Sequence, residues 1–290
     1  MFAAPSVKGQ MLAAEHVRLP GAFRRLGGQN ARISQLCANS GDAMPGASRP
    51  SMTRSQAGGR LLTVVDLGRT RYAQALARQT ELLALRRRDC VGDTLLLTEH
   101  EPVVTLGRST EEPGMPDAEA LERAGIELHE ATRGGKVTYH GPGQLVGYPI
   151  LDLRALFDGR PDLHRFVEGI ETVLVQALQD LGIPAQSREG LRGVWVQCRK
   201  IASIGVAVRG WVSYHGFALN VCNDLSPFRL IEPCGLPDVE MTSMSVELGR
   251  EVAVGEVAGA VVDRFAEHFG MTALRQTEDP TAESLPLQGG

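Results

Sequence analysis

Long apolar runs are missing from this sequence of 290 residues, and so is any pattern of paired cysteines. A membrane-spanning helix needs about 20 consecutive apolar residues, so we expect no membrane partner. The five cysteines are an odd number without paired spacing, which argues against a disulfide framework and fits a reducing compartment such as the cytoplasm. No CxxC or clustered Cys/His pattern occurs, so we expect no metal site.

Lysine is also scarce in this chain. Only Lys8, Lys136 and Lys200 occur among 30 Lys and Arg, so the two lysines in the body of the chain need an explanation.

The charge is distributed unevenly along the chain. Residues 1–60 hold eight Lys and Arg against two Asp and Glu, a net charge of +6. Because the whole chain has a net charge of −4, the other 230 residues carry −10. Because phosphate contacts need clustered cations, this balance disfavours nucleic acid as the main partner.

Residues 1–60 form a leader rich in Gly, Ser, Ala and Arg without sustained hydrophobic periodicity, and we expect it to be disordered or cleavable. An organelle transit peptide has this composition, which makes organelle targeting the alternative to the cytoplasm. A second interpretation of this leader is that the start codon is assigned too early and that translation begins at Met52. Residues 276–290 also have the composition of a disordered tail, which leaves one domain over 61–275.

Hydrophobic periodicity in the body of the chain predicts an α/β fold, in which helices pack on a mixed sheet. The helix at 163–182 is the clearest, because apolar residues recur on one face while Asp162 and Gly182 supply a start and a stop. Further helices are predicted at 70–88, 118–125 and about 258–269. Strands are predicted at 61–68, 93–100, 102–107, 126–131 (half-buried by its alternation) and 136–140, followed by a meander at 193–197, 201–208 and 212–221.

The stretch "RGGKVTYHGPGQ", residues 133–144, concentrates glycines and polar side chains. Glycines let the backbone approach a bound group closely and expose N–H donors to it. Arg133, His140 and Gln144 would then converge on one side of a cleft. The alternative is a plain strand between two hairpin turns, with its polar residues in solvent. Neither a GxGxxG nor a GxxxxGK[ST] pattern is present, so this is not a dinucleotide or P-loop segment.

Two histidines and one lysine stand at the ends of predicted strands. His140 and His215 each precede a glycine, which indicates strand ends that open onto a common site, although either could be a hydrogen-bonded structural histidine. Lys200 begins the apolar run "KIASIGVAV", where an ammonium would be partly desolvated. Alternatively, its aliphatic stem simply extends from a turn towards water.

Cys234 differs from the other cysteines because it lies between Pro233 and Gly235, away from any predicted helix or strand. Such a loop can present a sulfur and backbone N–H groups to a substrate. A reactive cysteine needs partial exposure and an electropositive neighbour, and Lys200 is a candidate for that neighbour. The alternative is an ordinary loop cysteine. Cys37 lies in the leader, and Cys90, Cys198 and Cys222 lie in or beside apolar segments and are interpreted as structural or incidental.

Four motifs, "RGGKVTYHGPGQLVGYP", "KIASIGVAV", "SYHGFALNV" and "PCGL", occur in an order and spacing that resembles the lipoyl(octanoyl) transferases. The resemblance covers about residues 61–270 and implies the catalytic-domain fold of biotin and lipoate protein ligases. It also implies transfer of an octanoyl group from acyl carrier protein to a lysine of lipoyl domains, in 2-oxoacid dehydrogenases and the glycine cleavage H protein. The octanoyl group would arrive on the phosphopantetheine of the carrier protein, and no other cofactor is implied.

The same resemblance assigns roles to particular residues. Cys234 would be the nucleophile that accepts the acyl group as a thioester, and Lys200 would favour its thiolate. The substrate pocket would be formed by Arg133, Gly134, Gly135, Lys136, Val137, Thr138, Tyr139, His140, Ser203, Ile204, Gly205, His215, Gly216 and Phe217.

Three other functions compete with this one. An ATP-dependent lipoate or biotin protein ligase would use the lysine at position 200 but would not need Cys234. A cysteine hydrolase would release the free acid, and a non-catalytic acyl-carrier-binding protein would form no covalent adduct. Carrier proteins and lipoyl domains are typically acidic, so recognition would need a local arginine patch, for which Arg69, Arg71 and Arg86 to Arg88 are candidates, or simply solvated helix ends.

Overall fold

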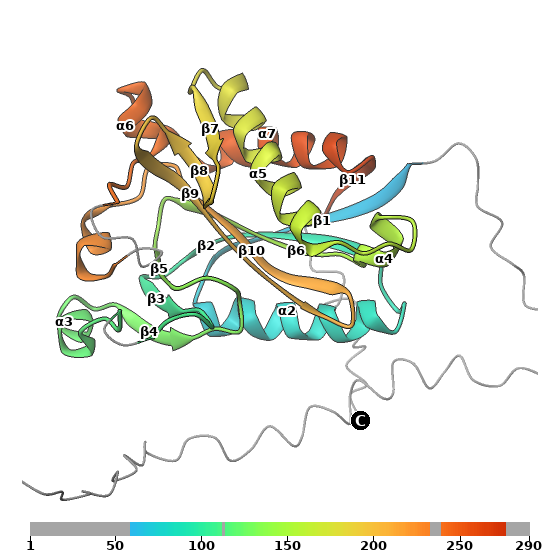
Figure 1. The fold of residues 1–290 in the computed structure, drawn as a ribbon, viewed down its shortest axis with the longest axis horizontal. Helices are drawn as coiled ribbons and strands as arrows, with labels where there is room; N and C mark the ends of the chain where they lie inside the picture. Colours follow the sequence, from blue (N-terminus) through green and yellow to red (C-terminus); the bar gives the residue numbers. More distant parts are fainter. Residues whose placement is uncertain (1–58, 112–113, 233–238, 277–290) are drawn as a thin grey trace, which may run out of the picture. The chain divides into compact units, whose positions relative to one another are not determined.

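The computed structural model describes residues 59–111, 114–232 and 239–276, and these residues form two sheets with helices packed on them (Figure 1). The α/β prediction, with a mixed sheet and packed helices, is therefore confirmed. The predicted leader and tail lie almost entirely outside the described residues, so the division into 1–60, 61–275 and 276–290 stays a prediction.

The larger sheet has eight strands in the order β11-β1-β2-β6-β10-β9-β8-β7. Strand β1 runs parallel to both β11 and β2, and the remaining neighbours are antiparallel. The predicted meander is confirmed as β8, β9 and β10. The strands are β1 Arg60–Thr70, β2 Asp93–His100, β6 Gln144–Ile150, β7 Ala185–Arg188, β8 Leu191–Val196, β9 Arg199–Arg209, β10 Val212–Asn220 and β11 Met271–Gln276.

A second sheet of three strands has the order β4-β3-β5, comprising β3 Val103–Leu106, β4 Glu127–Glu130 and β5 Val137–His140. Strand β4 pairs with β3 alone among the described strands, so it is an edge strand. Three of its four residues are exposed, so the prediction that 126–131 is half-buried was wrong for most of this strand. The physical reason is its place at the edge of the small sheet, where a strand has a paired neighbour on one side only among the described strands.

Two layers of helix cover the large sheet, one on each face (Figure 1). Helices α5 (Leu163–Asp180) and α7 (Val254–His268) pack on one face, and α2 (Tyr72–Arg87) packs on the other. The Asp162 side chain accepts the N–H of Arg165 at 3.0 Å, which confirms the predicted start of α5. The short helices are α3 Ala118–Arg123, α4 Leu153–Leu156, the 3₁₀ helix η1 Ser226–Leu230 and α6 Met244–Leu248.

The carboxylate of Asp93 ties three elements together at the start of β2. It accepts the Nε of Arg60 and the Nε of Arg86 (2.9 Å), and the backbone N–H of Asp152 at 3.1 Å. Arg86 also pairs with Asp89 and is buried. Arg86 is therefore a structural residue of α2, and it drops out of the candidate patch for an acidic partner.

Strand β6 was not predicted, although it lies in the middle of the large sheet. Its sequence contains Pro149, which is typical of an edge strand because proline has no N–H to donate. The pairing with β10 ends at Gly147–Phe217, and Pro149 pairs only with Leu95 of β2. The pairing resumes only at the Asp152–Val212 bridge, and the local bend at His215, which has a φ of 55°, lies in this gap. The missing N–H of Pro149 therefore falls where β10 and β6 do not pair.

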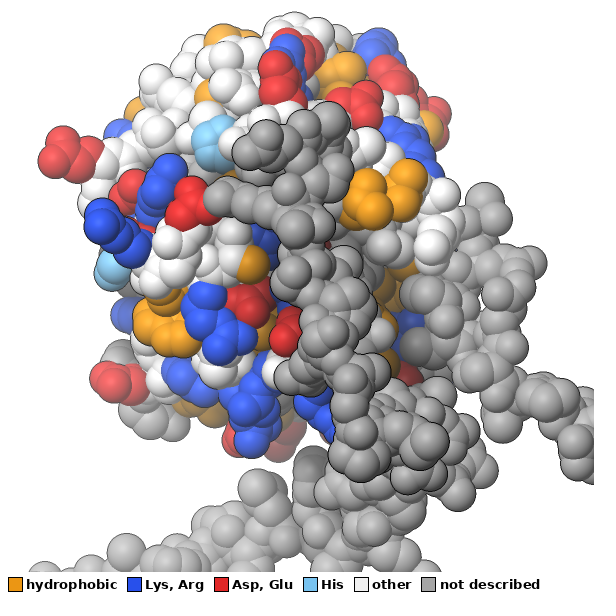
Figure 2. Space-filling view, turned by 90° about the vertical axis from the view of Figure 1, so that its right-hand side faces the viewer, with side chains coloured by type: hydrophobic (Ala, Val, Ile, Leu, Met, Phe, Trp, Pro, Cys, Tyr) orange, Lys and Arg blue, Asp and Glu red, His pale blue; other side chains and the backbone are white. Residues whose placement is uncertain are grey.

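Within the described residues, no helix combines the length and the apolar character that crossing a membrane requires. The face shown in Figure 2 carries acidic and basic side chains side by side, with basic ones gathering towards its lower end. Helix α2 lies at the same height in Figure 1, and Arg87 and Arg88 at its C-terminal end are exposed.

Candidate active site

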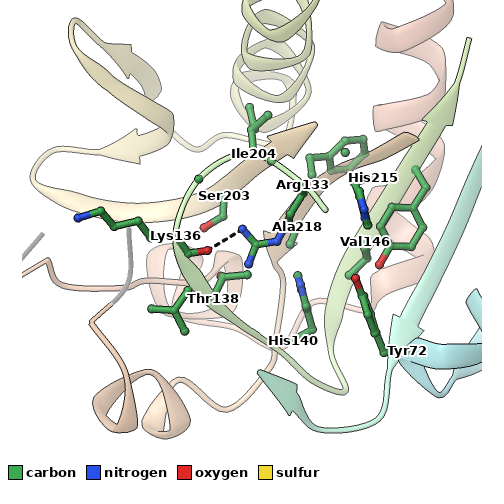
Figure 3. Close-up of a pocket in the computed structure, with 16 residues that line it drawn as sticks. Tyr72, Arg133, Lys136, Thr138, His140, Val146, Ser203, Ile204, His215 and Ala218 are labelled. Atoms are coloured by element: carbon green, nitrogen blue, oxygen red, sulfur yellow. Dashed lines mark hydrogen bonds between the residues drawn. The ribbon is translucent and has the colours of Figure 1, made fainter. Parts of the chain in front are cut away.

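A cavity of about 500 Å³, counted with its open mouth, lies where the two sheets meet. The glycine-rich segment before β5 closes one side, and the middle of β9 and the bend of β10 form the other (Figure 3). Strand β6 and the first residue of α2 complete it. Segments that are far apart in the sequence therefore converge here. His140 ends β5 as predicted, whereas the prediction that His215 ends a strand was wrong, because it lies within β10; both nevertheless line the cavity.

Arg133 crosses the cavity wall and holds the glycine-rich segment against β3. Its guanidinium donates to the carbonyl and hydroxyl oxygens of Thr105, both at 2.7 Å, and to the carbonyl of Lys136 at 2.7 Å. Gly205 faces its side chain, and a Cβ there would lie 3.0 Å from Arg133 Cδ. Arginine suits this position because a rigid fork of five donors can hold several oxygens at once.

The hydrogen-bond partners of His140 determine where its proton lies. The amide nitrogen of Gln144 donates to the carbonyl of Tyr139 (3.2 Å), so the oxygen of that amide faces His140 and accepts from Nδ1 at 2.8 Å. The Nε2 atom is left as an acceptor for the hydroxyl of Thr105 at 3.5 Å. His140 is thus a neutral imidazole with its proton on Nδ1.

His100, at the end of β2 in the larger sheet, has the same arrangement, and its ring centre lies 5.8 Å from that of His140. Its Nδ1 faces the carbonyl of Thr70 at 3.2 Å and must donate, so Nε2 accepts from the hydroxyl of Tyr148 at 2.7 Å. Tyr148 lines the cavity, and burial raises the pKa of its phenol well above the ordinary value. His100 therefore fixes the direction in which that hydroxyl points.

His215 is held in an unusual backbone conformation at the cavity wall. Its φ of 55° lies in the left-handed region, which costs a non-glycine residue about 1–3 kcal/mol. The backbone N–H donates to the side-chain oxygen of Gln79, on α2, at 2.9 Å. The Nε2 atom of the ring lies 3.1 Å from the hydroxyl of Thr132. A buried glutamine two turns into α2 thus supports the bend in β10.

All three histidines have lowered pKa values: about 3 for His140, about 3 for His215 and about 4 for His100. Burial is the main cause in each case, and the positive charge of Arg133 adds to it at His140 and His215. At neutral pH these side chains are uncharged. His140 and His215 therefore supply oriented dipoles to the cavity rather than a second positive charge, and His100 acts on it through Tyr148.

Tyr72 brings an unpaired hydroxyl to the cavity from the start of α2 (Figure 3). Its side chain is buried, and among the described residues its hydroxyl has no hydrogen-bond partner. Burial raises the pKa of this phenol to about 12, so it stays protonated as a donor. An unsatisfied buried hydroxyl costs free energy, so a polar group of a bound ligand would stabilise it.

Apolar side chains line the rest of the cavity. The Phe217 ring lies directly over Gly147, where a Cβ would approach the ring to 2.1 Å. This glycine therefore makes room for an aromatic wall between β6 and β10. The other apolar lining residues are Val137, Val146, Ile204 and Ala218.

Lys200 is buried at the start of β9 and does not line this cavity. Its ammonium donates to the carbonyl of Arg192 at 2.8 Å and lies 5.3 Å from the centre of the Trp195 ring. Its backbone N–H donates to the carbonyl of Glu240, and its carbonyl accepts from Thr242, at 2.8 and 2.9 Å. Lys200 is three residues before Ser203 of the cavity wall, about 10 Å along the strand.

A polar network connects the cavity to the neighbourhood of Lys200. Gln144 donates to the side-chain oxygen of Asn220 at 2.8 Å, and Asn220 donates to the carbonyl of Thr242 at 3.0 Å. Thr242 in turn pairs with the backbone of Lys200. The glycine-rich segment and the lysine are therefore held in one hydrogen-bonded framework.

Most of the predicted pocket residues line the cavity. The exceptions are Gly134 and Tyr139. The Tyr139 ring packs on Phe228 instead, with 5.4 Å between the ring centres. Lys136 lines the cavity with its backbone, while its side chain points outwards (Figure 3). Cys234 lies outside the described residues, so its predicted distance to Lys200 stays untested. Of the other cysteines, Cys90, Cys198 and Cys222 are exposed and outside the cavity lining.

Sequence reasoning missed several residues of the site. Tyr72 and Gln79 stand seven positions apart in α2, on the same helical face, and this spacing was a signal that they act on one surface. His100 ends a predicted strand before a turn, as His140 does. The lining residues that were not predicted are Tyr72, Val146, Tyr148 and Ala218.

Comparison with known proteins identifies the domain. Residues 71–266 match the family model described as the lipoyl protein ligase A/B catalytic domain. An octanoyltransferase from Koribacter versatilis is 45% identical over 236 residues, which cover 79% of this chain and 94% of that protein. An octanoyltransferase from Solibacter usitatus is 49% identical over 205 residues, covering 70% and 89%.

Solved structures show the same fold at lower identity. Lipoate-protein ligase A bound with ATP superposes with a TM-score of 0.59 at 17% identity, covering 77% of this chain and 90% of that one. A bi-partite lipoate protein ligase from Thermoplasma acidophilum gives a TM-score of 0.60 at 18% identity, covering 76% and 88%. These likenesses establish the lipoate ligase fold of the chain.

Proposed function

This chain belongs to the octanoyltransferases, a family of acyltransferases that serve protein lipoylation, and we propose that it carries the octanoyl group on Cys234 as a thioester between donor and acceptor. The observation that supports this most directly is the mainly apolar cavity with a few buried hydrogen-bond donors. Its apolar wall of Val146, Ile204 and Phe217 suits an alkyl chain, and its buried donors suit a carbonyl oxygen.

The proposed donor is octanoyl-acyl carrier protein, in which phosphopantetheine holds the acyl group. The Cys234 thiolate attacks the thioester carbonyl, a new C–S bond forms, and the bond to the phosphopantetheine sulfur breaks. That sulfur leaves as a thiolate and takes a proton. One thioester replaces another, so the exchange needs neither ATP nor another cofactor.

The proposed acceptor is a lysine of a lipoyl domain, in 2-oxoacid dehydrogenases or the glycine cleavage H protein. Its neutral amine attacks the acyl-enzyme, a C–N bond forms, and Cys234 leaves as a thiolate while the amine loses one proton. Lys200 favours the thiolate at the start, because a nearby ammonium stabilises it. The neutral histidines of the cavity and Arg133 hold the walls in place while the acyl chain enters.

Recognition of acidic carriers needs exposed cations near the cavity. Arg69 and Arg71 are exposed beside the start of α2, where Tyr72 enters the cavity, whereas Arg87 and Arg88 stand at its other end. A helix of 16 residues is about 24 Å long, so these arginines form two groups. We place carrier docking at Arg69 and Arg71, and we place the reaction in the cytoplasm.

The test is intact mass spectrometry after incubation with octanoyl-acyl carrier protein, for the wild type and for Cys234→Ser. We expect one octanoyl adduct on the wild type, transfer of that adduct to a lipoyl domain, and neither in the variant. Cys222→Ser is a matched control, since that cysteine is exposed outside the cavity lining. Full transfer by Cys234→Ser, dependence on ATP, or release of free octanoate without an acceptor would each contradict the proposal.

A further inference from the structure

Glu171 is a buried carboxylate on the face of α5 that packs against the large sheet, and the reaction described above does not use it. Its helical neighbours on that face, Ile170 and Leu174, are fully buried apolar residues. Burying a carboxylate among such residues is costly unless it is hydrogen-bonded or paired. The position therefore calls for a specific partner on the sheet.

That partner is the backbone of β8. One oxygen of Glu171 accepts the N–H of Gly193 at 2.8 Å, and the other lies 3.4 Å from the guanidinium of Arg192, which is about half exposed. On the other side of the same strand, the ammonium of Lys200 donates to the carbonyl of Arg192 at 2.8 Å. The carbonyl of Arg192 and the N–H of Gly193 belong to a single peptide group.

One planar peptide thus stands between an ammonium and a carboxylate. A trans peptide points its C=O and N–H in opposite directions, and its dipole of about 3.5 D runs between them. The oxygen end faces Lys200 and the N–H end faces Glu171, so each charge strengthens the hydrogen bond at the other end. In a buried environment this coupling is stronger than in water.

Gly193 allows the peptide to take this orientation. Its φ is 115°, and a Cβ at this position would lie 2.5 Å from the carbonyl of Ala202 and 2.6 Å from Cε of Lys200. The register between β8 and β9 shifts at the next residues, Val194 and Trp195. A bulge with a glycine is a common means of re-aiming a backbone group next to a site.

We propose that Glu171 is a positioning residue for Lys200, acting through the peptide group of Arg192 and Gly193 to hold the ammonium in place. This rests on the proposed function, in which Lys200 acts on Cys234. Other charged or aromatic groups around the pair are Arg192 and Glu168, the Trp195 ring with Arg188 beside it, and the Arg199–Glu247 ion pair on β9 and α6.

The test is a double-mutant cycle on the rate of octanoyl transfer, using Glu171→Gln, Lys200→Met and the double variant. Glutamine keeps an oxygen for the N–H of Gly193 but removes the charge. Because charge-assisted hydrogen bonds are about twice as strong as neutral ones, we expect a rate loss of about tenfold from Glu171→Gln in the wild-type background. We expect little further loss in the Lys200→Met background.

Separate measurement of kcat and KM distinguishes positioning from folding. In Glu171→Gln we expect kcat of octanoyl transfer to fall while KM for octanoyl-acyl carrier protein is unchanged, because the ammonium is held less firmly. Glu168→Gln, one turn earlier on α5 and exposed, should match the wild type. Thermal unfolding of each variant reports whether it folds, and a Glu171→Asp variant that restores the wild-type kcat supports the assignment.

Two kinds of outcome distinguish the role of Glu171 from the role of Lys200. An unchanged kcat in folded Glu171→Gln, or an equal loss in both backgrounds, overturns the role of Glu171 and leaves the function intact. Wild-type activity in Lys200→Met overturns the role of the lysine and the positioning role with it.

Discussion

At the scale of single residues, the site depends on side chains whose partners leave them one possible proton arrangement. His140 faces an amide oxygen at Nδ1 and a hydroxyl at Nε2, and His100 faces a carbonyl and a phenol in the same order. Each ring must donate from Nδ1. A fixed tautomer fixes the direction of the hydroxyl groups next to it, including that of Tyr148 in the cavity.

We predict that replacing Gln144 by Met removes the hydrogen-bond acceptor of His140 Nδ1 but leaves the proton on that atom. The hydroxyl of Thr105 already accepts from Nε and Nη2 of Arg133 and can only donate to Nε2, so the tautomer is kept and the Nδ1–H resonance moves upfield as its hydrogen bond is lost. We also expect a loss of about 1–3 kcal/mol in the free energy of unfolding, since buried polar groups lose partners. Long-range ¹⁵N–¹H spectra at neutral pH measure the tautomer, and His100 is the internal control. An unchanged His140 spectrum would contradict the assignment.

At the scale of elements, one face of helix α2 both lines the cavity and contacts strand β10. Tyr72 enters the cavity at its start, and Gln79 supports the bend of β10 two turns later. The bend lies in the stretch where β10 and β6 do not pair, which is also where Pro149 lies, and the His215 side chain lines the cavity. The cavity therefore depends on how α2 packs on the sheet.

We predict that Gln79→Leu destabilises the protein by about 1–3 kcal/mol, because it leaves the backbone N–H of His215 buried without an acceptor. Hydrogen exchange at the amide of His215 should become faster, and the bend of β10 should relax. Urea unfolding and amide exchange measure the two effects. The control is Thr80→Ala, an exposed neighbour on the same helix, which should change neither. Equal exchange rates at His215 in both variants would contradict this role of Gln79.

At the scale of the whole molecule, burial of three histidines makes folding depend on pH. Their pKa values of about 3 to 4 in the folded state are well below the ordinary value of 6.5. As the pH falls below 6.5, the unfolded chain binds protons that the folded chain does not. The stability these neutral histidines provide is therefore present above pH 6.5 and is lost progressively down to pH 3 to 4.

We predict that the free energy of unfolding drops by about 4 kcal/mol between pH 7.5 and 5.5, a little over 1 kcal/mol for each histidine. Urea unfolding at a series of pH values measures the slope. His100→Gln should remove about a third of it. A free energy of unfolding that is flat over this range would show that the histidines are not buried in the neutral form.

Local patterns in the sequence were sufficient for most elements and for much of the site. Helix α5 followed from its apolar stripe and from Asp162, and the meander followed from alternating runs between turns. The glycine-rich segment, His140 and His215 were predicted to meet, and they line one cavity, although His215 lies within a strand and not at its end. These features depend on the period of the chain and on turn residues, which a single sequence displays.

What the sequence alone determined was the α/β fold, the family, and the chemical types gathered at the cavity. Only the tertiary structure decided that Arg86 is buried against Asp93, that Tyr139 turns away from the cavity, and that Glu171 meets the peptide in front of Lys200. The reason is physical: each of these depends on a contact between residues distant in the chain, or on which side of a strand faces the core. Such contacts are set by how the layers pack, and periodicity within one element does not encode them.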